Sequence, residues 1–171
     1  MIVSEVAQVA GVPRETLRAW LKKDGLFDFD RPDRTWKKFS DFETLLIAIY
    51  AALVRQTQDY DLAHVGMLLC GKLLMEEWRE DEIGTPYFEE STFERDRLMI
   101  FSRGKNERWS CDIANAGDDF NSLINKGLSE SYNVAPAFTV ANLGAIMRIV
   151  LIKLLKVQVG MIDANAAEAP K

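Results

Sequence analysis

Hydrophobic residues recur at helical spacing through the first part of the chain. Ser4 is expected to cap a short first helix, which Gly11 ends in a left-handed conformation. A second helix is predicted over residues 14–23, where Leu17 and Leu21 lie four residues apart and share one face. Two short helices joined by a tight link, with apolar side chains between them, predict a helix-turn-helix.

The helical pattern is interrupted between residues 26 and 38. This stretch contains Pro32, several aspartates and spaced aromatic residues, which predict an irregular segment or a hairpin. Ser40 or Asp41 is then expected to cap a third helix that runs to about residue 56. A fourth helix is predicted over residues 60–78, with its leucine-rich face covering the N-terminal core.

The pattern changes again after residue 80. Residues 82–97 contain many acidic residues with a glycine and a proline, which predict a linker. Residues 98–102 and 109–113 have the composition of two short strands, joined as a hairpin. Pattern and capping residues predict a last long helix over residues 140–159, opened by Thr139, and a short helix near residues 119–124.

Charge is distributed unevenly along the 171 residues, whose net charge is −5. Residues 1–56 carry nine Lys/Arg and eight Asp/Glu, and residues 14–38 alone carry eight basic and five acidic side chains. The acidic surplus therefore lies in the remainder of the chain. An acidic protein with a local basic stretch is compatible with a nucleic-acid partner at that stretch.

An ordered set of short motifs runs through the same N-terminal part. The motifs are Ser4-Glu5-Val6-Ala7, Gly11-Val12, Glu15-Thr16-Leu17-Arg18, Ala19-Trp20, Lys23-Asp24-Gly25-Leu26 and Arg34-Thr35-Trp36-Lys37-Lys38-Phe39-Ser40-Asp41-Phe42-Glu43. In this order they resemble the MerR-type winged helix-turn-helix family, over residues 1 to about 75. The resemblance implies a recognition helix over residues 14–23 and a wing over residues 31–39.

The sequence departs from that family in three respects. Ala19 stands where an aromatic residue is usual, and Thr35 stands where glycine often precedes the aromatic residue of the wing. The family's long antiparallel dimerisation helix, directly after the fourth helix, is not evident. We expect either of the first two differences, at Ala19 or at Thr35, to be able to change the recognised sequence without removing DNA binding.

The second helix carries the candidate DNA-binding residues. Arg14, Arg18 and Lys22 recur at intervals of four and line one face. Arg18 is the first choice for a base contact, because a guanidinium binds guanine through two hydrogen bonds. Arg14, Lys22 and Lys23 are expected to contact phosphates, and Thr16 a phosphate or a thymine methyl group.

The wing adds a second group of candidates. Arg34, Lys37 and Lys38 are expected to hold the DNA backbone beside the groove. Trp36 either contacts DNA or packs in the core, whereas Phe39 is expected to pack beneath the wing. The cations also have structural alternatives, since surface lysines are often only solvated and the two arginines of the second helix have Glu15 and Asp24 as alternative partners.

No catalytic, metal or cofactor site is predicted, so we do not expect an enzyme. The chain has one histidine, His64, and two cysteines, Cys70 and Cys111, without the spacing of a zinc site. No nucleotide-binding or hydrolase motif occurs. The N-terminus lacks the pattern of a signal peptide, and three cations interrupt the apolar stretch of residues 141–159, so a cytoplasmic protein without a membrane span is expected.

The sequence therefore predicts a mainly α fold in four parts: a winged helix-turn-helix of residues 1–80, an acidic linker of residues 81–97, a small α+β or helical region of residues 98–162, and a flexible tail of residues 163–171. The expected function is sequence-specific binding of double-stranded DNA in transcriptional regulation. The alternatives are a phage-type architectural protein, similar to an excisionase or a terminase small subunit, and a protein-interaction module without DNA binding.

The last helix bears on the oligomeric state. Its wide apolar stripe is expected to pack on a second copy, because regulators of this type bind palindromic sites as twofold dimers. The alternative is a monomer whose helix covers its own core. RNA polymerase or another protein is a further candidate partner.

Overall fold

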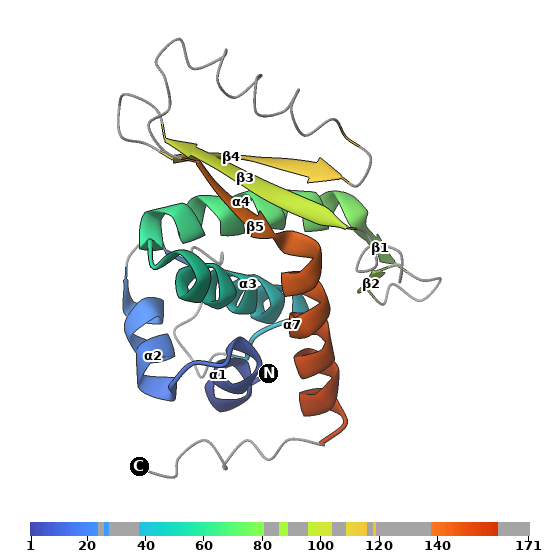
Figure 1. Ribbon diagram of the computed structural model, residues 1–171. Coiled ribbons are helices and arrows are strands. Elements are labelled where there is room, and N and C mark those ends of the chain that lie inside the picture. Colours follow the sequence, from blue (N-terminus) through green and yellow to red (C-terminus); the bar gives the residue numbers. More distant parts are fainter. Residues whose placement is uncertain are drawn as a thin grey trace. The chain divides into compact units, whose positions relative to one another are not determined.

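The computed structural model describes residues 1–23, 26–27, 38–80, 86–88, 96–103, 109–115, 118 and 138–160. Within these residues the chain is mainly helical, with a small antiparallel sheet (Figure 1). The helices are α1 (Val3–Ala10), α2 (Arg14–Lys22), α3 (Asp41–Thr57), α4 (Tyr60–Glu77) and α7 (Leu143–Gln158). The strands are β1 (Trp78–Glu80), β2 (Pro86–Phe88), β3 (Arg97–Arg103), β4 (Trp109–Asn115) and β5 (Phe138–Asn142).

The chain forms two compact units. The first comprises Met1–Ala52 and Ile149–Lys171, and the second comprises Leu53–Arg148. The first unit therefore holds α1, α2, most of α3 and the C-terminal part of α7, and the second holds α4 and the strands. These boundaries differ from the divisions at residues 80 and 98 that the sequence suggested.

Helix α1 begins earlier than predicted. Its N-cap is Ile2, so Ser4 lies within the first turn rather than at the cap. The Ile2 side chain has no acceptor for the free N–H groups of the first turn, and the Glu5 carboxylate accepts a hydrogen bond from the Ile2 N–H at 2.7 Å. The predicted Ser4 cap is wrong because a carboxylate from inside the helix ties down the backbone before it.

Helix α3 begins where the sequence predicted. Ser40 and Glu43 form a reciprocal capping box: the Ser40 N–H donates to Glu43 Oε2 at 2.7 Å, and the Glu43 N–H donates to Ser40 Oγ at 3.1 Å. Residues 44–51 are all buried, so α3 has no solvent-facing side over this length.

Helix α4 ends one residue before its predicted end. Asp59 caps its start by accepting the Leu62 N–H at 2.9 Å. Trp78, predicted as the last helical residue, instead begins β1, which pairs antiparallel with β2. Part of the predicted linker of residues 81–97 is therefore a strand, and Arg97 begins the next one. Pairing with a neighbouring strand orders residues whose composition predicted a loop.

The hairpin predicted from residues 98–102 and 109–113 is confirmed. Strands β3 and β4 pair antiparallel, with Phe101 opposite Cys111. The third strand was not predicted: β5 pairs with the other edge of β3, giving the order β4-β3-β5. The predicted helix start at Thr139 is therefore wrong, and α7 starts at Leu143 with Asn142 Oδ1 accepting the Ala145 N–H at 2.9 Å.

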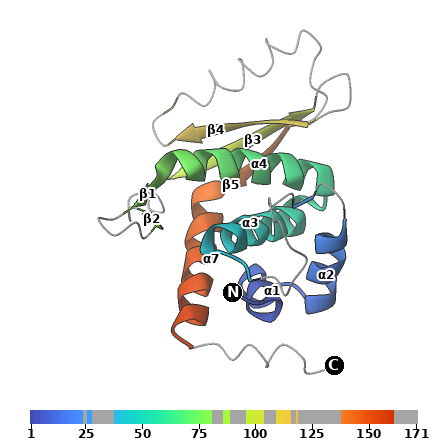
Figure 2. The ribbon, with the colours of Figure 1, turned by 180° about the vertical axis from the view of Figure 1, so that it is seen from behind.

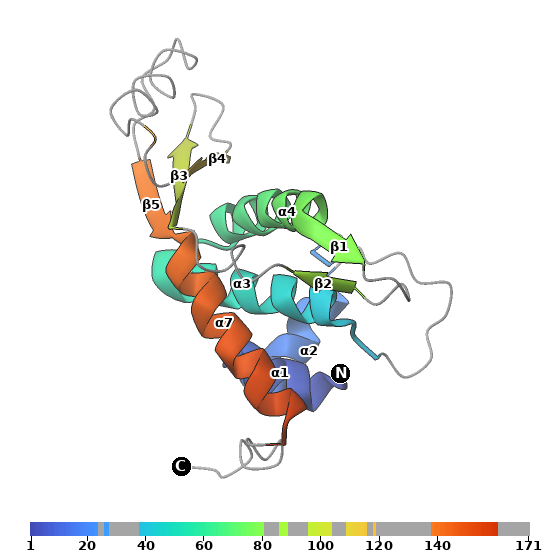
Figure 3. The same ribbon diagram turned by 90° about the vertical axis from the view of Figure 1, so that its right-hand side faces the viewer.

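Helix α4 lies along one face of this sheet within the second unit (Figure 3). A glycine allows the close approach, because a Cβ atom on Gly66 would lie 2.8 Å from Leu53 Cδ1 and 2.8 Å from Phe101 Cζ. Cys70 Sγ lies 3.8 Å from Met99 Sδ in the same interface. The core of the second unit thus lies between α4 and the sheet.

Candidate nucleic-acid interface

The link between α1 and α2 is a short turn with a left-handed glycine. Gly11 has φ 65° and ψ 40°, as the sequence predicted, and its N–H donates to the Gln8 carbonyl at 3.1 Å. The Val12 N–H donates to the Ala7 carbonyl at 3.0 Å, so both turn residues bond back to α1. Pro13 then precedes α2 as its N-cap residue. These bonds fix the direction in which α2 leaves α1 (Figure 2).

Helix α2 is anchored by its inner side. Leu17 is fully buried, and the Trp20 ring packs edge-on against Tyr50 of α3 with centroids 5.0 Å apart. Phe27 packs edge-on against Tyr50 as well, at 5.4 Å. The orientation of α2 on α3 is therefore set by three aromatic rings and a buried leucine.

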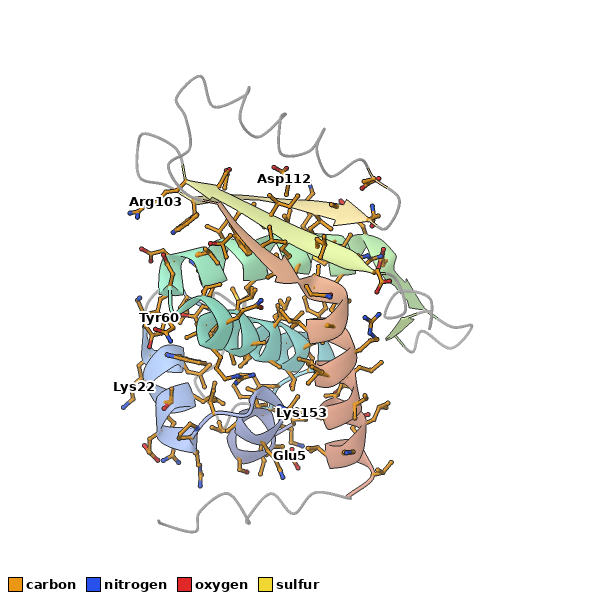
Figure 4. All side chains as sticks on the ribbon, viewed as in Figure 1. Glu5, Lys22, Tyr60, Arg103, Asp112 and Lys153 are labelled. Carbon is orange, nitrogen blue, oxygen red and sulfur yellow. The ribbon has the colours of Figure 1, made fainter. Side chains whose placement is uncertain are left out.

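The outer side of α2 carries the predicted cations. Arg14, Arg18 and Lys22 are all exposed, as is the C-cap residue Lys23, whereas Thr16 is half-buried. Lys22 projects from the helix away from α1 (Figure 4). The structure thus exposes the four predicted cations of this segment, whereas Thr16 is partly covered.

Arg18 has a partner on this face. Its Nη1 donates to Glu15 Oε1 at 2.7 Å, an ion pair between side chains that are 44% and 79% exposed. The pairing with Glu15 was one of the alternatives for Arg18. An exposed pair of this kind contributes about 0–1 kcal/mol, so it holds the guanidinium in place without preventing an exchange of partners.

The wing lies largely outside the described residues, which include neither Arg34, Trp36 nor Lys37. Lys38 is described and exposed. Phe39 is 2% exposed, which confirms its predicted burial. The Phe39 N–H donates to the Met1 carbonyl at 2.7 Å, and the Met1 amino group donates to the Phe39 carbonyl, so the backbone next to Lys38 is paired with the start of α1.

The two compact units differ in charge. The first unit contains eleven Lys/Arg and ten Asp/Glu, a balance of +1, and the second contains ten and sixteen, a balance of −6. The helix with the predicted cations thus belongs to the unit without an acidic surplus. A phosphate backbone is repelled less by this unit than by the other one.

The residues considered for other chemistry have no reactive arrangement in the described part of the chain. Burial raises the pKa of the Cys70 thiol strongly and that of the Cys111 thiol to about 12, so neither is a thiolate at neutral pH. His64 is half-buried on α4. No group of three or more His, Cys, Asp or Glu residues with the geometry of a metal site occurs among the described residues.

No helix among the described residues has the length and apolar character that crossing a membrane requires.

One residue on the outer face of α2 was not among the predicted contacts. Glu15 lies one turn from Arg18, and the spacing of three residues is the signal that points to their pairing. Because the Glu15 carboxylate is paired with the Arg18 guanidinium, a ligand that contacts Arg18 also lies close to Glu15.

No family model matches this chain, and no curated protein matches it either.

Proposed function

We propose that this chain binds double-stranded DNA in a sequence-specific manner and regulates transcription in the cytoplasm, with α2 in the major groove. The observation that carries the proposal is the exposed face of α2, on which Arg14, Arg18 and Lys22 lie in line while Leu17 is buried behind them. An α-helix fits the major groove and presents one such face to base edges.

The link before α2 supports the same proposal. Two short helices joined by a turn with a left-handed glycine agree with the N-terminal part of a MerR-type helix-turn-helix, which the sequence motifs resemble. In the proposed complex Arg18 contacts guanine, and Arg14, Lys22, Lys23 and Lys38 contact phosphates. The wing residues Arg34, Trp36 and Lys37 and the half-buried Thr16 complete the proposed interface.

The proposal is tested by selecting bound duplexes from a randomised library and measuring affinity by fluorescence anisotropy at several salt concentrations. The six proposed phosphate contacts of one copy, made by Arg14, Lys22, Lys23, Arg34, Lys37 and Lys38, predict a slope of about −5.4 per bound copy in a plot of log affinity against log salt, because each contact contributes about −0.9. Arg18→Ala is expected to cost about 1–3 kcal/mol on the selected duplex and to relax the base preference at one position. Absence of binding to any duplex at low salt would overturn the proposal.

The same selection separates a regulator from an architectural protein. A regulator is expected to protect one or two palindromic sites, whereas an architectural factor binds tandem sites and bends the duplex. Circular-permutation gel shifts with the selected site measure the bend. A strong bend on tandem sites would assign the protein to the architectural class.

We also propose that two copies bind such a site as a dimer. Support comes from α7, which exposes an aliphatic stripe at helical spacing consisting of Ile149 (55% exposed), Ile152 (52%) and Leu155 (50%), and Val159, the first residue after the helix, is also exposed (64%). The stripe provides less area than the roughly 800 Å² per partner of a standard interface, so we expect weak association that DNA strengthens.

The dimer is tested by analytical ultracentrifugation with and without the selected duplex. Ile152→Asp is expected to abolish association while leaving the fold intact, because this side chain is half exposed. The sequence of α7 contains cations but no acidic residue, so two copies of this helix cannot form ion pairs with each other. Added salt should therefore not weaken the contact between the copies, although it weakens DNA binding. A complex of one copy with the selected duplex would refute the dimer.

A further inference from the structure

Glu15 is an acidic residue placed among the cations of a helix proposed to face DNA. The residues of α2 that are exposed include Arg14, Glu15, Arg18 and Lys22, whereas Leu17 is fully buried. Glu15 is more exposed than Arg18, with side-chain values of 79% and 44%. A duplex that contacts Arg18 therefore also meets the Glu15 carboxylate.

Stability gives little reason for an acid at this position. Glu15 lies in the first turn of α2, where a negative charge contributes about 0.3–1 kcal/mol through the helix dipole. Its ion pair with Arg18 is exposed and adds a similarly small amount. The Glu15 carboxylate also repels the phosphates of a bound duplex, and this repulsion lowers the affinity for DNA of every sequence.

The carboxylate has a complementary group in the groove. Guanine presents two acceptors to a guanidinium, and cytosine presents an N4 amino group that donates to a carboxylate. Side chains three residues apart on a helix are neighbours, with about 5–6 Å between their Cβ atoms, and two long side chains from such positions can reach adjacent base pairs stacked about 3.4 Å apart. The pair of Arg18 and Glu15 thus has one donor group and one acceptor group at 2.7 Å, suited to adjacent bases.

From this geometry we infer that Glu15 is a specificity-determining residue of the DNA interface, which accepts a hydrogen bond from a cytosine amino group beside the base contacted by Arg18. The inference rests on the proposed function. The carboxylate lowers the affinity for unrelated sequences through its charge, and on the correct sequence it recovers this loss through the hydrogen bond. It also orients the guanidinium before binding, which reduces the conformations that Arg18 loses in the complex.

The experiment compares Glu15→Gln with wild type on two duplexes, the best one selected by the wild-type protein and an unrelated one of equal length. We expect the variant to bind the unrelated duplex about twofold or more tightly, since one repulsive charge is gone. The ratio of affinities for the two duplexes should fall about fivefold or more, because discrimination at one base pair is lost. A new selection with the variant should relax the preference for cytosine at one position next to that read by Arg18.

Glu5→Gln is the matched control. Glu5 is a first-turn glutamate on the neighbouring helix, and its carboxylate bonds to the Ile2 N–H. This substitution removes a charge of the same kind without touching α2, so the affinity ratio should stay unchanged. Circular dichroism of both variants verifies that the helices are retained.

The outcomes separate the two proposals. If wild type prefers its selected duplex and Glu15→Gln keeps the same ratio, the inference about Glu15 is overturned and DNA binding stands. If the variant loses affinity equally for both duplexes, Glu15 only stabilises α2, and the inference is again overturned. If wild type prefers no duplex, the proposed function and the inference fail together.

Discussion

Arg97 and Glu77 form a buried ion pair in the second unit, and we expect substitutions of its two partners to lower the free energy of unfolding by different amounts. Arg97 Nη1 donates to Glu77 Oε2 at 3.0 Å, and Arg97 Nη2 donates to Glu77 Oε1. The Arg97 side chain is 1% exposed and that of Glu77 is 17% exposed. Water therefore reaches the anion of this pair but hardly reaches the cation.

The expected magnitudes follow from which group is left behind. Glu77→Gln leaves a guanidinium buried without a compensating charge, which costs about 3–5 kcal/mol. Arg97→Met removes the cation together with its desolvation cost and fills a similar volume, and the remaining carboxylate keeps access to water. Since Arg97 Nε has no hydrogen-bond partner among the described residues, Arg97→Met also removes a buried donor that these residues leave unsatisfied. We expect Arg97→Met to cost about 1–2 kcal/mol, less than half the cost of Glu77→Gln.

Urea unfolding followed by circular dichroism measures the free energy of unfolding for both variants and for the double variant. The sharpest expectation is a rescue: adding Arg97→Met to Glu77→Gln should raise the stability, since it removes the stranded cation. The exposed pair of Arg148 and Asp96, at 3.2 Å, is the control, and Asp96→Asn should cost no more than about 1 kcal/mol. A double variant less stable than Glu77→Gln alone would refute the reasoning.

Three further predictions concern local features. Asp59→Ala removes both the cap of α4 and the acceptor of the Trp109 indole N–H at 2.9 Å, so the free energy of unfolding should fall by about 2–4 kcal/mol. The control Asp61→Ala should cost less than about 1 kcal/mol, and equal losses for the two variants in urea unfolding followed by tryptophan fluorescence would contradict the prediction. Gly11→Ala places a side chain at φ 65° and should cost about 1–2 kcal/mol in thermal unfolding, and an unchanged melting temperature would contradict this. Burial raises the pKa of the Cys111 thiol to about 12, so the folded state keeps a proton that the unfolded chain loses above pH 9.0, and stability should fall as pH rises from 9.0 to 12. At pH 8 the same thiol should react with a disulfide reagent far more slowly in folded than in unfolded protein, and equal rates would show that the thiol is not held in the protonated state.

Features that depend on a few neighbouring residues were predictable from the sequence. The Ser40 cap and Glu43 three residues later form a local pair, and the structure has both of their hydrogen bonds. Gly11 adopts the left-handed conformation that its position between two helices indicated. In such cases the physical cause lies within one or two turns of chain, so the sequence pattern contains it.

Features that depend on distant partners were not predictable. Residues 138–142 continue into an apolar helix without a break in composition, and their strand conformation follows from pairing with β3, about forty residues earlier in the chain. Pairing of β1 with β2, between residues six to ten positions apart, also replaced a predicted helix end and part of a linker. Register against another strand is a tertiary property, and the helical period of the following residues gave no sign of it.

The candidate interface shows the same division. Spacing by four residues predicted that Arg14, Arg18 and Lys22 share a face, and they are exposed on α2. The ion pair between Arg18 and Glu15 depends on the rotamers of two exposed side chains, so the sequence spacing gave this pairing only as one alternative. Sequence spacing thus fixed the side of the helix, and the structure added the hydrogen bond between its side chains.

Both boundaries between the compact units fall inside helices, which limits how the gene can be divided. The boundary after Ala52 lies within α3 (Asp41–Thr57), and the boundary before Ile149 lies within α7 (Leu143–Gln158). A truncation after Ala52 would cut α3 before the fully buried Leu53 and would discard the C-terminal segment of the same unit. The first unit, which contains the residues proposed to bind DNA, is therefore encoded by two separated stretches of the gene, and a fragment that ends at Ala52 lacks one of them.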